Sequence, residues 1–131
     1  MSVNRYKGSS FNAAGEFNIV SQKGVTLNFK NSSHSNENFK KSGHKGIVHL
    51  TNRKFIFVSK DYFDFSTPFS MLSDFDIKQP IFGANKLTGR TRGEPGECGF
   101  LGTVDWEMVF NEGGAIEFGQ LMQEFFNNML L

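Results

Sequence analysis

The sequence predicts an α+β fold that is mainly β, in which short strands form a small barrel or curled sandwich and one C-terminal helix covers its open end. Two patterns support this prediction. About seven short segments alternate apolar and polar residues as half-buried strands do, and the final segment, residues 113–131, has the apolar period of a helix. Phenylalanine occurs 16 times and supplies most of the large side chains for a shared core.

The C-terminal segment is the only long stretch with helical period. Its apolar residues recur at steps of three and four and form one stripe: Ala115, Phe118, Met122, Phe125 and Met129, widened by Leu121 and Phe126. Polar residues fill the opposite face, and a Gly-Gly pair at 113–114 lets the backbone turn into the helix. Because such a stripe must cover apolar surface, we expect the helix to close the mouth of the barrel.

The strands precede the helix at near-regular spacing. Residues 25–29 form the clearest early strand, and Gly24 separates it from a shorter run at 17–19. Residues 47–51 and 54–59 predict a hairpin that turns at 52–53, and its second arm has large apolar residues on both faces. Later strands are expected around residues 63–65, 74–78 and 103–111.

Three polar stretches separate or precede these strands. Residues 1–15 predict a flexible N-terminal arm, which leaves 16–131 as one domain, and residues 31–45 and 90–99 predict loops. Within 77–85 (IKQPIFGAN), Pro80 and Gly83 are expected to shape a bend while Ile81 and Phe82 fill the core. The alternative for this motif is a protein-docking edge.

Composition restricts the class of protein. The only cysteine, Cys98, cannot form an internal disulfide, which favours a reducing compartment: the cytoplasm, with the nucleus or a membrane surface as alternatives. No apolar run approaches the ~20 residues of a membrane span. Residues 1–60 carry ten Lys and Arg against two acids, a balance of +8, and residues 61–131 carry four against eleven, a balance of −7. Either the surface is polarised or interleaved strands mix the charges, and we expect no nucleic-acid partner.

No group of residues predicts catalysis, a cofactor or a metal site, so we expect a protein that is not an enzyme. His34, His44 and His49 lack the close spacing that zinc ligands prefer, with Cys98 or with each other. The paired carboxylates alternate with apolar residues and are expected to be solvent-facing strand residues: Asp74 with Asp76, and Asp105 with Glu107.

Two stretches allow a closer assignment. Residues 74–89 (DFDIKQPIFGANKLTG) and 113–122 (GGAIEFGQLM) resemble the GRAM domain of the WW-domain-binding protein two family, and 46–60 is similar to its second and third strands. The resemblance covers about residues 17–129. It implies a pleckstrin-homology-like fold, a bent seven-stranded barrel capped by a C-terminal helix. Members of the family bind WW domains through Pro-Pro-x-Tyr motifs, and since this chain has none, we expect no WW-domain partner through it.

Basic residues gather near the loop at 31–45 and around the hairpin that follows it, which Lys60 also borders. The candidate binding residues are Lys30, Lys40, Lys41, His44, Lys45, Arg53 and Lys54. In pleckstrin-homology-like folds the loop between the first two strands commonly holds anionic headgroups, so the resemblance implies a phosphoinositide or acidic-membrane site, into which Phe39 could insert. The alternative is a solvated loop whose lysines keep the protein in solution.

These observations favour a non-enzymatic adaptor module that binds a protein partner and an acidic phospholipid surface. The alternative is a structural subunit of a larger intracellular assembly.

Overall fold

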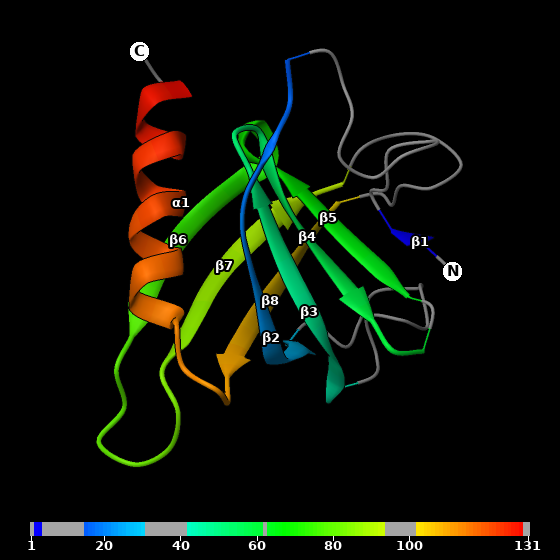
Figure 1. Cartoon of the computed structure of the whole chain (residues 1–131). Helices are drawn as coiled ribbons and strands as arrows, with labels where there is room; N and C mark the ends of the chain where they lie inside the picture. Colours follow the sequence, from blue (N-terminus) through cyan, green and yellow to red (C-terminus); the bar gives the residue numbers. More distant parts are fainter. Residues whose placement is uncertain (1, 4–14, 31–41, 62, 94–101, 130–131) are drawn as a thin grey trace.

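The chain folds into one eight-stranded sheet and a C-terminal helix. The computed structural model describes residues 2–3, 15–30, 42–61, 63–93 and 102–129 (Figure 1). The strands are β1 (Ser2–Val3), β2 (Asn18–Phe29), β3 (His44–Thr51), β4 (Lys54–Ser59), β5 (Asp64–Pro68), β6 (Leu72–Lys78), β7 (Lys86–Arg92) and β8 (Thr103–Phe110), and the helices are η2 (Phe69–Met71) and α1 (Ala115–Met129). The sheet order is β1-β5-β4-β3-β2-β8-β7-β6.

Seven of the strands, β2 to β8, pair antiparallel, and only the two-residue β1 pairs parallel, with β5. The sheet curls strongly, and α1 lies beside β6 and β7 at its open side (Figure 1). This arrangement confirms the predicted sheet closed by one C-terminal helix. Of the predicted N-terminal arm, residues 1 and 4–14 lie outside the described residues.

Aromatic side chains fill the interior of the barrel, and a short chain of hydrogen bonds runs among them. Phe55 and Trp106 pack edge to face with centroids 5.0 Å apart, and Phe29 packs likewise on Phe65 at 5.1 Å. The Trp106 indole donates a hydrogen bond to Thr91 Oγ1 (2.8 Å), and Thr91 Oγ1 lies 2.9 Å from Thr67 Oγ1. Because the two threonines belong to β7 and β5, which do not pair, this buried contact joins two strands that the hydrogen bonds of the sheet do not connect directly.

Helix α1 buries the predicted stripe over most of its length. Ala115, Phe118 and Met122 are at most 2% exposed, and the Phe118 ring packs on Phe110 of β8 at 5.5 Å. The stripe does not stay buried to its end, because Met129 is 44% exposed where the helix passes the edge of the sheet. Among the described residues, no helix has the length and apolar character needed to cross a membrane.

The hairpin is as predicted, but three element boundaries differ. β2 is one continuous strand, because Gly24 (φ 72°) forms a bulge instead of ending it. β3 already begins at His44, which shortens the predicted loop at 31–45. β7 extends through Arg92, so the predicted excursion at 90–99 begins as a strand. Gly89 and Thr91 occupy its inward positions, so no apolar alternation marks it.

The structure also overturns the expected position of Ile81 and Phe82. They lie in the loop between β6 and β7 and are 94% and 90% exposed, whereas the next inward residue of the apolar pattern, Leu87, is fully buried. Pairing with β7 stops at Lys78, before Pro80, so residues 79–85 leave the sheet and project from the molecule (Figure 1). These two side chains therefore do not fill the core.

Candidate functional site

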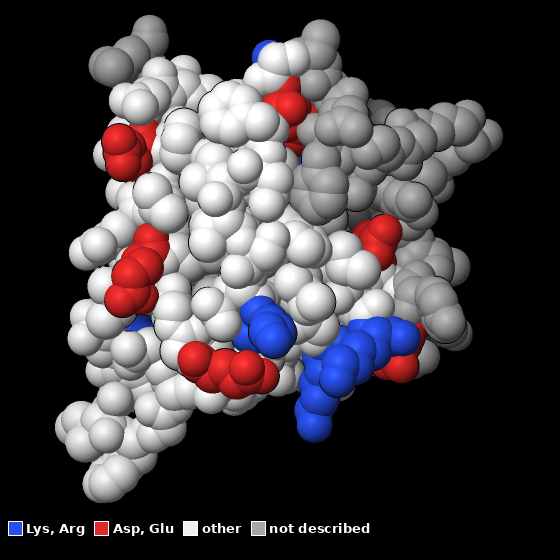
Figure 2. Space-filling model, viewed as in Figure 1, with Lys and Arg blue, Asp and Glu red and all other residues white. Residues whose placement is uncertain are grey.

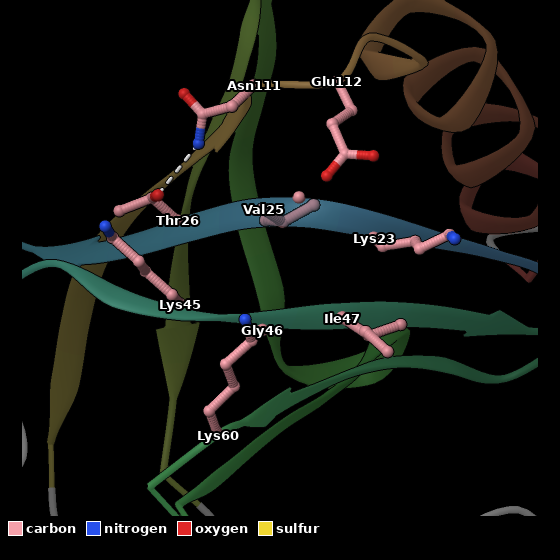
Figure 3. A pocket seen from close by; sticks show the side chains of 10 residues that line it. Lys23, Val25, Thr26, Lys45, Gly46, Ile47, Lys60, Asn111 and Glu112 are labelled. Atoms are coloured by element: carbon pink, nitrogen blue, oxygen red, sulfur yellow. Dashed lines mark hydrogen bonds between the residues drawn. The ribbon is translucent and has the colours of Figure 1, made fainter.

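A groove of about 470 Å³ lies at one end of the β3–β4 hairpin and is the best candidate for a binding site. Three lysines from different elements reach it: Lys23 of β2, Lys45 of β3, and Lys60 directly after β4. Figure 3 shows their side chains around the hollow, with Glu112, from the segment that follows β8, as the acid in its lining. The remaining lining residues are Gly24, Val25, Thr26, Gly46, Ile47 and Asn111.

Backbone geometry brings these lysines together. The bulge at Gly24 shifts the β2–β3 register between Gln22 and Val25, so that the strands separate locally where the groove opens. The Lys60 backbone N–H donates to the Lys45 carbonyl (3.0 Å), which holds these two residues side by side. The Asn111 amide side chain donates to Thr26 Oγ1 (2.9 Å) and fixes the wall above β2 (Figure 3).

The three groove lysines are exposed, and none forms an ion pair with another described residue. Figure 2 shows two patches of Lys and Arg atoms along the lower edge of this face, with acidic patches beside them on both sides. Three cations against one carboxylate leave the groove with an excess of positive charge. Its chemistry therefore suits an anion such as a phosphate group.

The predicted candidates fall in different places. Lys45 lines the groove, while Lys30 is paired with Glu107 of β8 at 3.2 Å. Arg53 lies at the opposite end of the hairpin, where it lines a second hollow of about 360 Å³. Lys40 and Lys41, with Phe39, lie outside the described residues.

His44 and Lys54 are buried, which removes them from any surface site. The His44 ring packs on Phe63 with centroids 4.8 Å apart and on Phe29 at 5.8 Å. Lys54 is 0% exposed, and its ammonium lies 3.1 Å from a carboxylate oxygen of Glu16. Neither side chain faces solvent, so neither belongs to the lysine groove.

Sequence reasoning did not include Lys23 in the site. It lies between the two predicted runs at 17–19 and 25–29, and the continuous strand β2 brings it to the groove. Lys60 was recognised only as bordering the hairpin. Its position in the sequence could have indicated this role. Lys60 follows the last residue of β4, and the paired strand β3 begins next to Lys45.

Charges of the two halves of the sequence meet where β2 pairs with β8. Glu107 accepts hydrogen bonds from Asn28 (3.0 Å) and Lys86 (2.9 Å) and pairs with Lys30. Burial raises the pKa of Glu107, but these hydrogen bonds and the lysine charges outweigh it and hold the pKa below its usual value. The charges here mix, as one of the two alternatives predicted. The groove keeps its excess of positive charge because three lysines and one glutamate line it.

The paired carboxylates of β6 and β8 form ion pairs on the surface of the sheet. Asp105 accepts from Arg90 Nε at 2.7 Å, and Asp76 lies 2.8 Å from the Lys78 ammonium, which holds the pKa of Asp76 below its usual value. Among the described residues, no three His, Cys, Asp or Glu side chains gather as a metal site would require.

The fold defines the class first. The solved structure "Vps36 N-terminal PH domain" has the same fold, with a TM-score of 0.66 over 99% of this chain and 94% of that one, at 15% identity. The chain therefore has the pleckstrin-homology-like fold that the sequence implied.

The relatives are more specific. The chain is similar to human "WW domain-binding protein 2", with 40% identity over 107 residues, or 79% of this chain and 40% of the relative. It is also 33% identical to human "Postacrosomal sheath WW domain-binding protein" over 82% of this chain and 36% of that protein. The chain thus spans about 40% of the length of these curated relatives. No family model matches it.

Proposed function

We propose that the chain is a GRAM-type, pleckstrin-homology-like module of the WW-domain-binding protein two family and that it works as a non-enzymatic adaptor. One side of the adaptor docks on an acidic phospholipid surface, and the other contacts a protein partner. This places the protein on the cytoplasmic side of membranes, where anionic lipids are concentrated. The observation that carries the lipid part is the groove in which Lys23, Lys45 and Lys60 converge without acidic partners among the described residues.

The physical basis is electrostatic. Each lysine that approaches an anionic leaflet contributes about 1 kcal/mol, and this attraction is screened by salt. A backbone hydrogen bond holds Lys45 and Lys60 side by side, and both residues line the groove, so both ammonium groups contribute to the attraction for an anionic surface. Lys40 and Lys41 remain predicted contributors to the same site.

Co-sedimentation with phosphatidylcholine vesicles containing phosphatidylserine tests this proposal over a salt series. The wild-type chain should bind at low salt and release as salt rises. The double variant Lys45→Ala/Lys60→Ala should partition about thirtyfold less, from about 1 kcal/mol per lysine. Arg90→Ala/Arg92→Ala is the matched control, because it removes two exposed cations of β7 outside the groove and should cost much less.

Two results would contradict the lipid part. If the wild-type chain stays in the supernatant at low salt, there is no acidic-surface binding. If both double variants lose the same amount, the net charge of the protein and not the groove attracts the vesicles.

The protein partner is supported by the relatives, whose names describe binding to WW domains. This chain has no Pro-Pro-x-Tyr motif, so its partner would have to contact the folded domain. Calorimetric titration of the chain with an isolated WW domain should show no heat of binding. Saturable binding would contradict this assignment.

A further inference from the structure

The loop between β6 and β7, residues 79–85, presents an unusual apolar tip. Ile81 is 94% and Phe82 is 90% exposed, whereas the next most exposed large apolar residue described, Phe17, is 57% exposed. The loop projects from the lower corner of the molecule in Figure 1, and in Figure 2 it is a projection of atoms that belong to no charged residue. A single exposed apolar residue is common on protein surfaces, but two neighbouring ones at a projecting tip indicate an interaction site.

The structure holds this tip away from the sheet. Lys78 of β6 and Lys86 of β7 are direct cross-strand partners at the base of the loop. The Asn85 carbonyl accepts a hydrogen bond from the Phe110 N–H (3.0 Å), which fastens the returning end of the loop to β8. Gly83 has φ 93°, a left-handed conformation that reverses the chain just past the tip. Ile81 and Phe82 therefore extend into solvent from a fixed base.

The tip and the lysine groove lie at the same end of the barrel. Figure 1 places the loop at the lower end of the molecule together with the start of β3, whose Lys45 lines the groove, and Figure 2 shows basic patches, with acidic ones beside them, along that edge. At the base of the loop, Lys78 and Lys86 are matched by Asp76 (2.8 Å) and Glu107 (2.9 Å). The loop thus supplies apolar contact, and the groove supplies the excess of positive charge.

We propose that the β6–β7 loop is a membrane anchor whose Ile81 and Phe82 insert into the interface of an acidic bilayer while Lys23, Lys45 and Lys60 face its headgroups. This inference rests on the proposed lipid docking and adds to it the depth and orientation of the bound protein. A flat bilayer touches a projecting tip and a cationic edge together, and it needs no pocket shaped for the tip. A protein partner would need a concave site for the tip, and nothing in the sequence or fold selects one.

A tryptophan probe at the tip tests this insertion directly. In the full chain, Phe82→Trp should show a blue-shifted emission on vesicles that contain phosphatidylserine, and brominated acyl chains should quench it. The native Trp106 is 1% exposed and gives a constant background. Phe17→Trp is the matched control, because Phe17 is an exposed ring beside Asn52 at the opposite end of the barrel, and its emission should not change.

A second variant measures how much the tip contributes. Ile81→Ser/Phe82→Ser should keep the thermal stability of the wild type, since both side chains are already in water. Its partitioning into the same vesicles should fall at least about tenfold, because two apolar side chains no longer leave water. Raising salt should release the wild type only in part, since insertion is not screened as charge contacts are.

The outcomes separate the two proposals. If the wild-type chain sediments with vesicles but the probe at position 82 shows no shift, or the double serine variant binds equally well, the anchor is overturned and the groove proposal stands. If the wild type does not sediment at all, both are overturned. A shift at position 82 without one at position 17 supports the anchor.

Discussion

Lysine side chains have opposite environments at the two ends of the β3–β4 hairpin. At the turn, Lys54 is buried against Glu16, and at the open end Lys45 and Lys60 are exposed without acidic partners among the described residues. The difference arises from what each end packs against. The turn is covered by residues 15–17, which bring a carboxylate, whereas the open end faces the gap that the β2 bulge creates. One end therefore contributes to stability, and the other is the end to which we assign the proposed binding.

The turn end is a closed polar cluster. Thr51 Oγ1 donates to Glu16 (2.6 Å) and accepts from the backbone N–H groups of Arg53 and Lys54 (both 3.1 Å). The Asn52 amide donates to the Gly15 carbonyl (3.1 Å) and accepts from the Phe17 N–H (3.0 Å). The segment before β2 is thereby fixed to the hairpin, and the comparison teaches that a cation is a site candidate only where no neighbouring segment brings it a partner.

The largest effect is expected from breaking the buried pair. Lys54→Met should destabilise the fold by about 3–5 kcal/mol, because it leaves the Glu16 carboxylate buried without its counter-ion. Urea unfolding at neutral pH measures this as a lower midpoint with an unchanged slope.

The double variant Glu16→Met/Lys54→Met is the control for this prediction. Replacing both charges with apolar side chains should recover most of the loss, since neither leaves an unpaired charge. A loss below 1 kcal/mol for the single variant would show that the pair is solvated, and the contrast between the two ends would then disappear.

The next effect comes from the hydroxyl at the centre of the cluster. Thr51→Val keeps the shape of the fully buried side chain but removes the donor to Glu16 and the acceptor for two backbone N–H groups. We expect a loss of about 1–3 kcal/mol in urea unfolding, the cost of leaving buried polar groups unsatisfied. Thr88→Val, at a half-buried threonine of β7, should change stability by much less. Equal losses in both variants would argue against a special role of the cluster.

Much of the fold follows from the sequence because its signals are local. Two apolar runs joined at residues 52–53 predicted the hairpin, and the three-and-four spacing of Ala115, Phe118 and Met122 predicted the face that α1 buries. The apolar periodicity of the sequence alone did not distinguish core residues from residues at a loop tip. Ile81 and Phe82 continue an apolar pattern, but Pro80 follows the last paired residue of β6, and a residue beyond the pairing has no sheet to face.

The candidate groove could be predicted only in part because it is a non-local feature. Lys54 looks like any hairpin lysine until the fold brings it Glu16, which lies 38 positions away in the sequence. Lys23 joins the site because β2 continues through the bulge at Gly24 and runs beside β3. Which lysines are free therefore depends on strand pairing, and a count of charges along the sequence does not show it.

The open end can be sharpened by removing its acid. Glu112→Gln should raise the partitioning of the chain into phosphatidylserine-containing vesicles about fivefold at low salt, from about 1 kcal/mol per charge at the membrane surface. Glu124→Gln is the matched control, an exposed acid on α1 that does not line the groove, and it should have little effect. The same gain in both variants would mean that the groove has no local preference for anions.

The smallest effect is expected in the middle of the hairpin, at His49 of β3, whose Nδ1 lies 2.6 Å from Ser21 Oγ. Burial lowers the pKa of His49 below its usual value of 6.5, and the nearby Asp64 charge only partly opposes this. Because the unfolded chain then takes up a proton that the folded chain resists, stability should fall as pH drops below about 6.5, by at most about 1.4 kcal/mol per pH unit.

His49→Gln should remove this part of the pH dependence, measured as urea midpoints at pH 7.5 and 5.5. The lowered pKa of Glu107 affects stability in a different pH range, because its stabilising contribution is lost only as pH falls below the usual glutamate value of 4.5. Glu107 therefore does not contribute to the pH dependence measured between pH 7.5 and 5.5. If the variant keeps the wild-type pH dependence, the imidazole is solvated and the middle of the hairpin resembles its open end. If the dependence disappears, burial extends from the Glu16–Lys54 pair at least as far as His49, and the exposed chemistry of the hairpin is confined to the residues around Lys45 and Lys60.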